Sequence, residues 1–386
     1  MTAVGIIGVG QTRYLRRHVG LSAAELVRVA VVEALDDAGI ELDAIDLVVG
    51  GVAPDSLAGV NDIDRMAIAA PGRPYFRVNT GGATGSSALL AAMTWIRAGR
   101  ADAVLVVALE RMGQAKTAQK IFNTIFDPIY EKDIVLTTIT MAALRASMLM
   151  KRHRFRPEQL AGIAARNFAN AIHNPLLEGV RAHTAEEVLA SPILAWPIHQ
   201  YEACPISEGA CAVVVARAPL AGSRPTAWVH GAAALSDTYS MGDRMRRPEG
   251  TLIDIVTLRR SAAAAYREAG IRDPEREVQL FELQAPFASM EVMTYAPLGL
   301  CTADDTKSFV ERRLAGEVAT WFNLSGGAQA ANPVSATALV RIAECALQVR
   351  GRAGRRQAPD VHRAVATGQG GATQFSTVVV LGEETP

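Results

Sequence analysis

Paired cysteines and an excess of charge are both missing from the 386-residue sequence. Cys204, Cys211, Cys301 and Cys345 are scattered, with no C-x-x-C pair and no histidine at ligand spacing. This pattern argues against a disulfide framework and a zinc site, so we expect no metal. The 39 basic residues balance the 39 acidic ones. Because basic residues are not in excess, we expect no binding to nucleic acid.

Targeting and membrane signals are also absent. Residues 1–10 lead directly into an apolar strand and lack the basic segment and small-residue cleavage site of a signal peptide. The apolar run over residues 103–109 is far shorter than the roughly 20 residues that span a bilayer. We therefore expect a cytoplasmic protein with no membrane span. Apolar residues make up 49% of the chain and charged residues 20%, a composition that suits a large buried core.

The first half of the chain alternates strand and helix patterns. Strands are predicted over residues 4–9, 45–50, 76–79 and 103–109. Helices are predicted over residues 21–38 and 85–98, with Ser22 placed to cap the first helix and Gly39 placed to end it. This β-α-β-α-β order predicts an α/β fold with a parallel sheet and helices on its faces.

The second half repeats this order. Both halves contain a helical pattern that ends in Ala-Gly-Ile, at residues 26–40 and 258–271. In each half an asparagine, Asn79 or Asn323, ends a strand immediately before a glycine-rich turn. A strand over residues 278–283 follows the second helical pattern. The repeated order predicts an internal duplication.

The predicted halves are residues 1–222 and residues 223–386, joined in a proline-containing segment. The first half carries an insertion at about residues 110–205, which includes a methionine-rich helical stretch over residues 139–150. Insertions of this kind usually cover an active-site mouth or a subunit interface.

Five motifs are spread over the whole chain. They read NTGGATG at residues 79–85, PIHQYEACPISEGACA at 197–212, ELQAPFASMEVMTYAPLGL at 282–300, NLSGGAQAANPVSAT at 323–337 and TGQGGA at 367–372. The duplicated frame and these motifs resemble thiolases, specifically the sterol-carrier-protein-type thiolases. The resemblance implies two β-α-β-α-β halves stacked in a five-layer α-β-α-β-α arrangement. It also implies an acyl-CoA thioester as substrate, with no covalently bound cofactor.

The residues at the family's catalytic positions are of a different type. Gly82 stands where the family has its nucleophilic cysteine. Gln284 and Asn332 stand where the family has histidines, and no cysteine is near Gly368 in the last motif. A glycine has no side chain to take up an acyl group, so an acyl-enzyme at this position is excluded.

The polar and flexible parts of such a site are retained. Gln284 and Asn332 can donate hydrogen bonds to an enolate oxygen, although they cannot carry protons at neutral pH. Glu282 precedes Gln284 in the same strand and is either a base or a structural carboxylate. Glycines in the turns are expected to let a CoA thioester approach the backbone closely. These glycines are Gly81, Gly326, Gly327 and Gly370.

A site with donors and no nucleophile suits retro-aldol cleavage of a β-hydroxyacyl thioester. Aldolases of the lipid-transfer-protein type resemble sterol-carrier-type thiolases, lack the same cysteine and work with an OB-fold partner protein. The resemblance therefore implies a carbon–carbon lyase that forms a homodimer and a complex with an OB-fold protein. One alternative is a non-catalytic thiolase-like subunit of an acyltransferase or thiolase complex. Another is a different acyl transfer that uses residues not recognised in the motifs.

Two further sets of residues have ordinary interpretations. Cys204, Cys211 and Cys345 are predicted to pack in the core. The basic segments at residues 242–250 and 350–357 are predicted to be solvated loops, with the CoA phosphates or an acidic partner as the alternative ligand.

Overall fold

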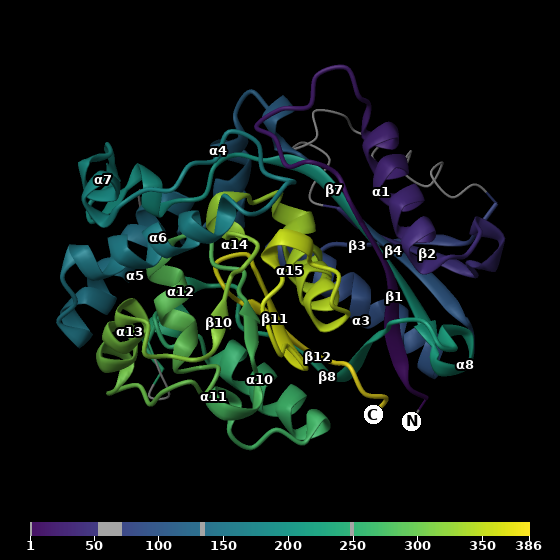
Figure 1. The fold of residues 1–386 in the computed structure, drawn as a ribbon. Coiled ribbons are helices and arrows are strands. Elements are labelled where there is room, and N and C mark those ends of the chain that lie inside the picture. Colours follow the sequence, from purple (N-terminus) through teal and green to yellow (C-terminus); the bar gives the residue numbers. More distant parts are fainter. Residues whose placement is uncertain (1, 53–71, 132–135, 248–250) are drawn as a thin grey trace.

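The computed structural model describes residues 2–52, 72–131, 136–247 and 251–386 (Figure 1). The first half contains β1 (Val4–Gln11), α1 (Ala23–Ala38), β2 (Leu47–Val52), β3 (Tyr75–Val78), α3 (Thr84–Arg97), β4 (Ala103–Arg111) and β7 (Glu208–Arg217). The second half contains β8 (Ala227–Ser236), α10 (Val256–Ala269), β9 (Leu280–Glu282), β10 (Trp321–Phe322), α15 (Val334–Val349), β11 (Arg363–Gly370) and β12 (Phe375–Gly382). The strands and helices predicted from the sequence are present, with ends shifted by at most three residues.

These strands form one mixed sheet in the order β10-β9-β11-β12-β8-β1-β7-β4-β2-β3. Counted outward from the centre of the sheet, the strands of the first half come in the order β1-β7-β4-β2-β3. The strands of the second half come in the equivalent order, β8-β12-β11-β9-β10. The matching order confirms the internal duplication. The half-sheets join through one short antiparallel contact, in which Gly5 and Ile6 of β1 pair with Trp228 and Ala227 of β8.

The prediction of a parallel sheet is wrong for one strand in each half. β7 runs antiparallel to both β4 and β1, and β12 runs antiparallel to both β11 and β8. β11 and β12 are joined by a short turn at residues 371–374, and a short turn can connect only antiparallel neighbours. β4 and β7 are joined by the long insertion instead of a single crossover helix.

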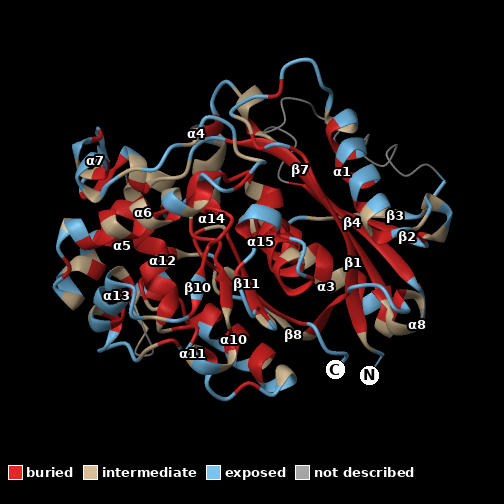
Figure 2. Cartoon of the chain, viewed as in Figure 1, coloured by how far each residue is buried: buried red, intermediate tan, exposed pale blue. Residues whose placement is uncertain are grey.

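Helices and half-sheets stack in five layers (Figure 1). α1 covers the outer face of the first half-sheet, α10 covers the outer face of the second, and α3 and α15 pack together between them. Successive residues of one strand pack into cores on opposite faces of the sheet, because side chains alternate between the two faces. Ile6 of β1 belongs to the central core, whereas Ile7 belongs to the core under α1. The buried residues follow these layers (Figure 2), so the α-β-α-β-α arrangement is confirmed.

The two outer helices end in the same way. α1 is capped by Ser22, which accepts a hydrogen bond from the Glu25 backbone, and it ends at Gly39 with a φ of 63°. α10 ends at Gly270 with a φ of 70°. A left-handed residue at this position favours glycine because it has no Cβ. The Ala-Gly-Ile repeat therefore marks equivalent helix ends in the two halves.

The insertion between β4 and β7 forms a helical layer over the second half. It contains α4 (Ala118–Phe122), α5 (Thr138–His153), α6 (Pro157–Ala171), α7 (Ala185–Ala190), β5 (Ile193–Ala195) and β6 (Ile198–His199). The methionine-rich stretch is helical, as predicted, because it lies in α5. Both α5 and α6 pack against α12 (Ala288–Tyr295). Within the described residues, no helix is both long enough and apolar enough to cross a membrane.

Shorter elements complete the chain. The helices are α8 (Ala218–Ala221), α9 (Met241–Met245), α11 (Pro274–Glu277), α13 (Thr306–Ala315) and α14 (Gly327–Ala330). The 3-10 turns are η1 (Leu42–Ala44), η3 (Gly81–Ala83), η4 (Met112–Gln114), η5 (Asn123–Ile125), η6 (Gln200–Glu202) and η7 (Gly354–Arg356).

The basic segment at residues 350–357 is not a solvated loop throughout. Arg350 Nη1 lies 2.7 Å from Asp37 Oδ2, and Arg356 Nη2 lies 2.9 Å from Glu344 Oε2. Both arginines are buried. Because Asp37 lies on α1, the Arg350 pair connects the C-terminal end of α15 to the outer helix of the other half.

A buried carboxylate lies where β4 meets α15. Glu110 accepts hydrogen bonds from the Arg111 backbone N–H at 2.9 Å and from the Ser335 hydroxyl at 3.2 Å. Burial raises the pKa of Glu110 to about 7, because removal from water disfavours the ionised form.

We predict that Glu110→Gln stabilises the protein at alkaline pH. The pKa of Glu110 is higher in the folded state than in the unfolded state, so its contribution to stability is complete below the unfolded pKa and is lost as the pH rises through about 7. Between pH 5.5 and 8.5 this ionisation lowers the free energy of unfolding by about 2 kcal/mol in the wild type and not in the variant. Urea denaturation of both proteins at these two pH values measures the difference. An identical pH response would contradict the prediction.

Candidate functional site

A cavity of about 390 Å³ lies under the insertion, where the glycine turn of the first half meets the terminal glycine loop of the second half. Gly81 and Gly82 line it from the first half, and Gln284, Asn332 and Gln369 line it from the second. The insertion contributes most of the apolar wall. Its residues there include Met112, Ile121, Phe122, Ile125, Ile139 and Met141. The insertion thus covers this cavity.

The glycine turn of the first half touches the terminal loop of the second half, backbone against backbone. A Cβ atom added to Gly82 would collide with the carbonyl oxygen of Gln369 and lie 2.6 Å from Gln284 Nε2. A Cβ on Gly370 would collide with the carbonyl oxygen of Thr80. Gly81 has a φ of 61°, which disfavours other residues. The position of a nucleophilic side chain at residue 82 is therefore filled by the second half of the chain.

Gln284 links the two sides of this contact. Its Nε2 donates to the Gly82 carbonyl at 2.8 Å, and its Oε1 accepts from the Gln369 backbone N–H at 2.9 Å. A side-chain amide has two N–H donors, so one N–H of Gln284 is left for a ligand. Gln284 thus lines the cavity, and its hydrogen bonds there are to the backbone, while its role in catalysis stays a prediction.

Asn332 also lines the cavity, beside a cysteine. Its Oδ1 accepts from the Thr337 hydroxyl at 2.7 Å, and its Nδ2 donates to Cys204 Sγ at 3.2 Å. The prediction that Cys204 packs in the core is wrong, because this half-buried thiol lines the cavity. Burial raises the pKa of Cys204 to about 11, so at neutral pH it is a thiol and not a nucleophilic thiolate.

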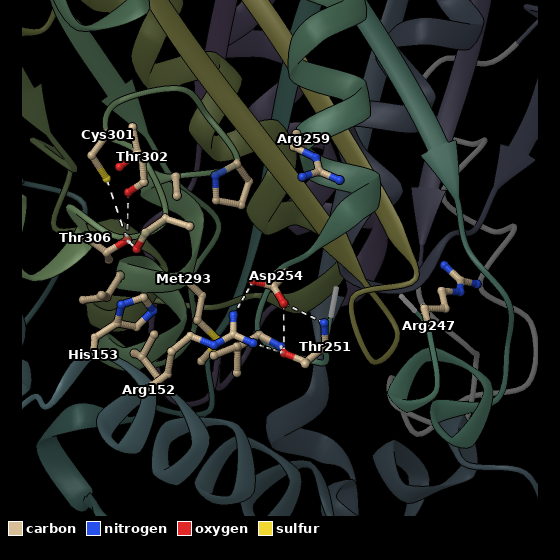
Figure 3. A pocket seen from close by; sticks show the side chains of 16 residues that line it. Arg152, His153, Arg247, Thr251, Asp254, Arg259, Met293, Cys301, Thr302 and Thr306 are labelled. Carbon is tan, nitrogen blue, oxygen red and sulfur yellow. Dashed lines mark hydrogen bonds and ion pairs between the residues drawn. The ribbon is translucent and has the colours of Figure 1, made fainter. Parts of the chain in front are cut away.

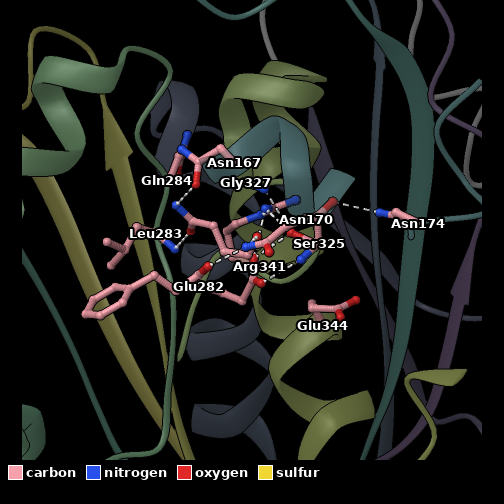
Figure 4. A network of polar contacts seen from close by, with 12 residues as sticks. Asn167, Asn170, Asn174, Glu282, Leu283, Gln284, Ser325, Gly327, Arg341 and Glu344 are labelled. Carbon is pink, nitrogen blue, oxygen red and sulfur yellow. Dashed lines mark hydrogen bonds and ion pairs between the residues drawn. The ribbon is translucent and has the colours of Figure 1, made fainter. Parts of the chain in front are cut away.

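Glu282 does not line the cavity. It lies in a network of polar contacts with Ser325 and Arg341 (Figure 4). It is fully buried, with Arg341 Nη1 at 2.9 Å. Ser325 donates to it from its backbone N–H at 3.0 Å and from its hydroxyl at 2.7 Å. Burial raises the pKa of Glu282 to about 7, and the charge of Arg341 opposes this rise. The sequence allowed Glu282 to be either a base or a structural carboxylate. These contacts are the ones expected of a structural carboxylate.

Three of the glycines expected at a CoA thioester do not line the cavity. Gly326 and Gly327 have φ values of 93° and 66° and pack against Ala171 and Asn323, respectively. Gly370 packs on the first glycine turn, and it is the next residue, Gly371, that reaches the cavity. Thus Gly81 is the member of this predicted set that the structure places at the cavity.

Gln369 is a cavity residue that the sequence interpretation missed. Its side chain is buried, with 5% of its surface exposed, and neither Oε1 nor Nε2 has a hydrogen-bond partner. An unpaired buried amide is costly, on the order of 1–3 kcal/mol. Its place between Gly368 and Gly370 in the last motif was visible in the sequence, whereas the missing partner depends on the three-dimensional arrangement.

The cavity wall contains almost no titratable groups. Among its described residues Cys204 is the one that titrates, and none is Asp, Glu, His, Lys or Tyr. Across the described part of the chain, no three His, Cys, Asp or Glu side chains are placed to hold a metal ion. The arrangement can bind a largely apolar ligand and donate hydrogen bonds to it, and it contains no obvious proton acceptor.

A second cavity, of about 510 Å³, lies between α5, α10 and the segment after α12 (Figure 3). It is lined by Arg152, His153, Asp254, Arg259 and Cys301, among others. The pKa of Cys301 is also raised by burial, to about 11. None of the residues predicted for the thioester site lines this cavity.

Two family models match the chain. The model "Thiolase, N-terminal domain" matches residues 4–219, and "Thiolase C-terminal domain-like" matches residues 245–383. Sterol carrier protein 2 of Gallus gallus is 29% identical over 388 residues, which cover 96% of this chain and 70% of that protein. An acetyl-CoA acetyltransferase of Methanothermobacter thermautotrophicus is 27% identical over 367 residues, covering 92% of this chain and 93% of that protein.

Solved structures share the fold. The Ltp2-ChsH2(DUF35) aldolase superposes with a TM-score of 0.83 at 23% identity, covering 99% of this chain and 98% of that one. A monomeric SCP2-thiolase-like protein type 1 from Mycobacterium smegmatis superposes with a TM-score of 0.72 at 19% identity, covering 99% of this chain and 77% of that one. The duplicated halves, the sheet order and the family matches agree: the chain belongs to the thiolase family and resembles its SCP2-thiolase-like members.

Proposed function

We propose that this chain binds a β-hydroxyacyl-CoA thioester in the 390 Å³ cavity and cleaves it by a retro-aldol reaction without an acyl-enzyme. The observation that carries the proposal is the unpaired amide of Gln369 in a mainly apolar wall. An amide offers one acceptor and two N–H donors. A β-hydroxyacyl thioester matches it, because its hydroxyl donates and its carbonyl accepts.

The reaction needs no nucleophile from the protein. A base removes the hydroxyl proton of the substrate, the bond between the α and β carbons breaks, and the electron pair moves to the thioester carbonyl. The products are a carbonyl compound and a thioester enolate, which a proton at the α carbon converts to the shorter thioester. Preorganised donors lower the energy of the enolate. The remaining N–H groups of Gln284 and Asn332 and the amide of Gln369 are the donors we assign to this role.

We assign the base to a partner protein, because the described wall offers no carboxylate, imidazole, amine or phenol. The description of the Ltp2-ChsH2(DUF35) aldolase, which shares the fold, names two proteins in one aldolase. A DUF35-type protein is the partner that we propose, and the OB-fold expected for the partner from the sequence stays a prediction. The homodimer expected from the sequence stays a prediction.

A second candidate function is a non-catalytic thiolase-like subunit. It is favoured by the same lack of acidic and basic groups in the wall. Incubation of 3-hydroxyacyl-CoA with the purified chain, alone and with a DUF35-type partner, separates the two functions. We expect cleavage with the partner and little without it. Tight thioester binding with no product in either mixture would contradict the lyase and favour the subunit.

We predict that Gln369→Leu weakens binding of 3-hydroxyacyl-CoA about 3- to 10-fold, because the variant loses one neutral hydrogen bond to the ligand. The same variant should unfold at an equal or higher urea concentration, because it removes an unpaired buried amide. Gln119→Leu is the matched control, since the Gln119 amide in the same wall already donates to Asn123 and Thr138. Calorimetric titration gives the affinities. Weaker binding that is equal in both variants would show that Gln369 has no specific role.

We predict that Gly82→Cys does not restore a thiolase nucleophile. A Cβ at this position collides with the terminal loop, so the substitution should lower the free energy of unfolding by about 1–3 kcal/mol. Gly82→Ala should cost about as much, because the Cβ causes the collision. Intact-mass spectrometry after incubation with acetyl-CoA checks the chemistry. Saturating, hydroxylamine-sensitive acetylation of the cysteine variant, absent from the alanine variant, would contradict this account.

A further inference from the structure

The second cavity, of about 510 Å³, is separate from the 390 Å³ cavity (Figure 3). No described residue lines both. The two ends of α5 lie at different cavities, because Thr138 and Met141 line the smaller one, whereas Arg152 and His153 line the larger one. A volume of about 300–1,000 Å³ is typical of pockets that bind small molecules. The larger cavity therefore has the size of a ligand site and a place of its own in the fold.

One side of this second cavity is apolar. Leu149 of α5, Ile253, and Val292 and Met293 of α12 line it, and all four side chains are buried. Apolar surface that a ligand places against such side chains contributes about 25 cal/mol per Å² to binding. The wall therefore favours a ligand with an aliphatic part.

The polar side contains an ion pair that is complete within the protein. Arg152 Nη1 lies 2.5 Å from Asp254 Oδ1, and Arg152 Nη2 donates to the Thr251 hydroxyl at 3.0 Å. Thr251 in turn donates to Asp254 Oδ2, from its backbone N–H at 2.6 Å and from its hydroxyl at 2.9 Å. The charges of Arg152 and Asp254 thus balance each other, and Figure 3 shows these contacts as dashed lines.

One positive charge in the wall is left unbalanced. Arg247 pairs with Asp237, with Nη1 and Oδ2 2.9 Å apart. The guanidinium of Arg259, on α10, makes no hydrogen bond or ion pair with any residue that the structure describes (Figure 3). Burial, together with the nearby charge of Arg152, lowers the pKa of His153, so this ring is neutral at pH 7 and adds no charge. The wall therefore offers a single free cation beside an apolar surface.

We propose that the second cavity binds an aliphatic monocarboxylate, whose carboxylate pairs with Arg259 and whose chain lies against Leu149 and Met293. A guanidinium and a carboxylate match in charge and in the geometry of their hydrogen bonds. A single negative charge balances the free arginine. A neutral alcohol of the same length leaves Arg259 unpaired, and an amine of that length is repelled by it.

Alkylation of two cysteines in the whole chain tests the site. Cys301 lines the second cavity and Cys204 lines the 390 Å³ cavity, and burial raises the pKa of both thiols to about 11. Each thiol therefore reports on its own cavity. Sodium octanoate should slow the alkylation of Cys301 by iodoacetamide saturably and leave the rate at Cys204 unchanged. 1-Octanol should need a concentration about 3- to 10-fold higher for the same protection, because it lacks the charge. Peptide mass spectrometry gives both rates.

Two variants assign the charge to one arginine. Arg259→Gln should raise the octanoate concentration for half-maximal protection of Cys301 about 3- to 10-fold and leave that of octanol unchanged. Arg260→Gln is the matched control, since it removes the same charge from the next residue of α10, which does not line the cavity. Both arginines are exposed, so both variants should fold.

Three results would overturn the proposal. The first is octanoate that protects neither cysteine or protects Cys204 alone. The second is equal protection of Cys301 by octanoate and octanol. The third is an Arg259→Gln protein with the same octanoate response as the wild type.

Discussion

The contact between two glycine loops, one from each half of the chain, determines the rest of the site. Gly82 of the first half meets the carbonyl of Gln369, and Gly370 of the second half meets the carbonyl of Thr80. Neither loop has room for a Cβ at the point of contact. Gln284 fixes the two loops together by bonding to the backbone of both. The depth of the cavity and the direction of its polar groups follow from this contact.

The same contact changes the chemistry available to the fold. In a thiolase this turn presents a nucleophile. Here the space next to Gly82 is occupied by the terminal loop of the second half, at the carbonyl of Gln369. What remains is an apolar cavity with side-chain amides in its wall, and the buried amide of Gln369 has no hydrogen-bond partner among the described residues. We propose that this site holds a thioester and stabilises negative charge on its oxygen, with the proton acceptor supplied by a second protein.

Much of the fold could be predicted from the sequence, because strand and helix patterns and the Ala-Gly-Ile ends are local signals that recur in both halves. The direction of β7 and β12 could not, because it depends on how their connections run in space. For the site, the motifs located Gly82, Gln284 and Asn332 at one cavity. They did not reveal that Cys204 lines it or that Gln369 lacks a partner, since both facts depend on segments far apart in the sequence.

The central claim is that this cavity binds an acyl thioester without bonding to it covalently. Titration of the chain with 3-hydroxyacyl-CoA, followed by intact-mass spectrometry of the same sample, tests it most directly. The account predicts saturable binding of one thioester per site and an unchanged protein mass. A protein that carries an acyl adduct, or one that shows no saturable binding, would contradict it.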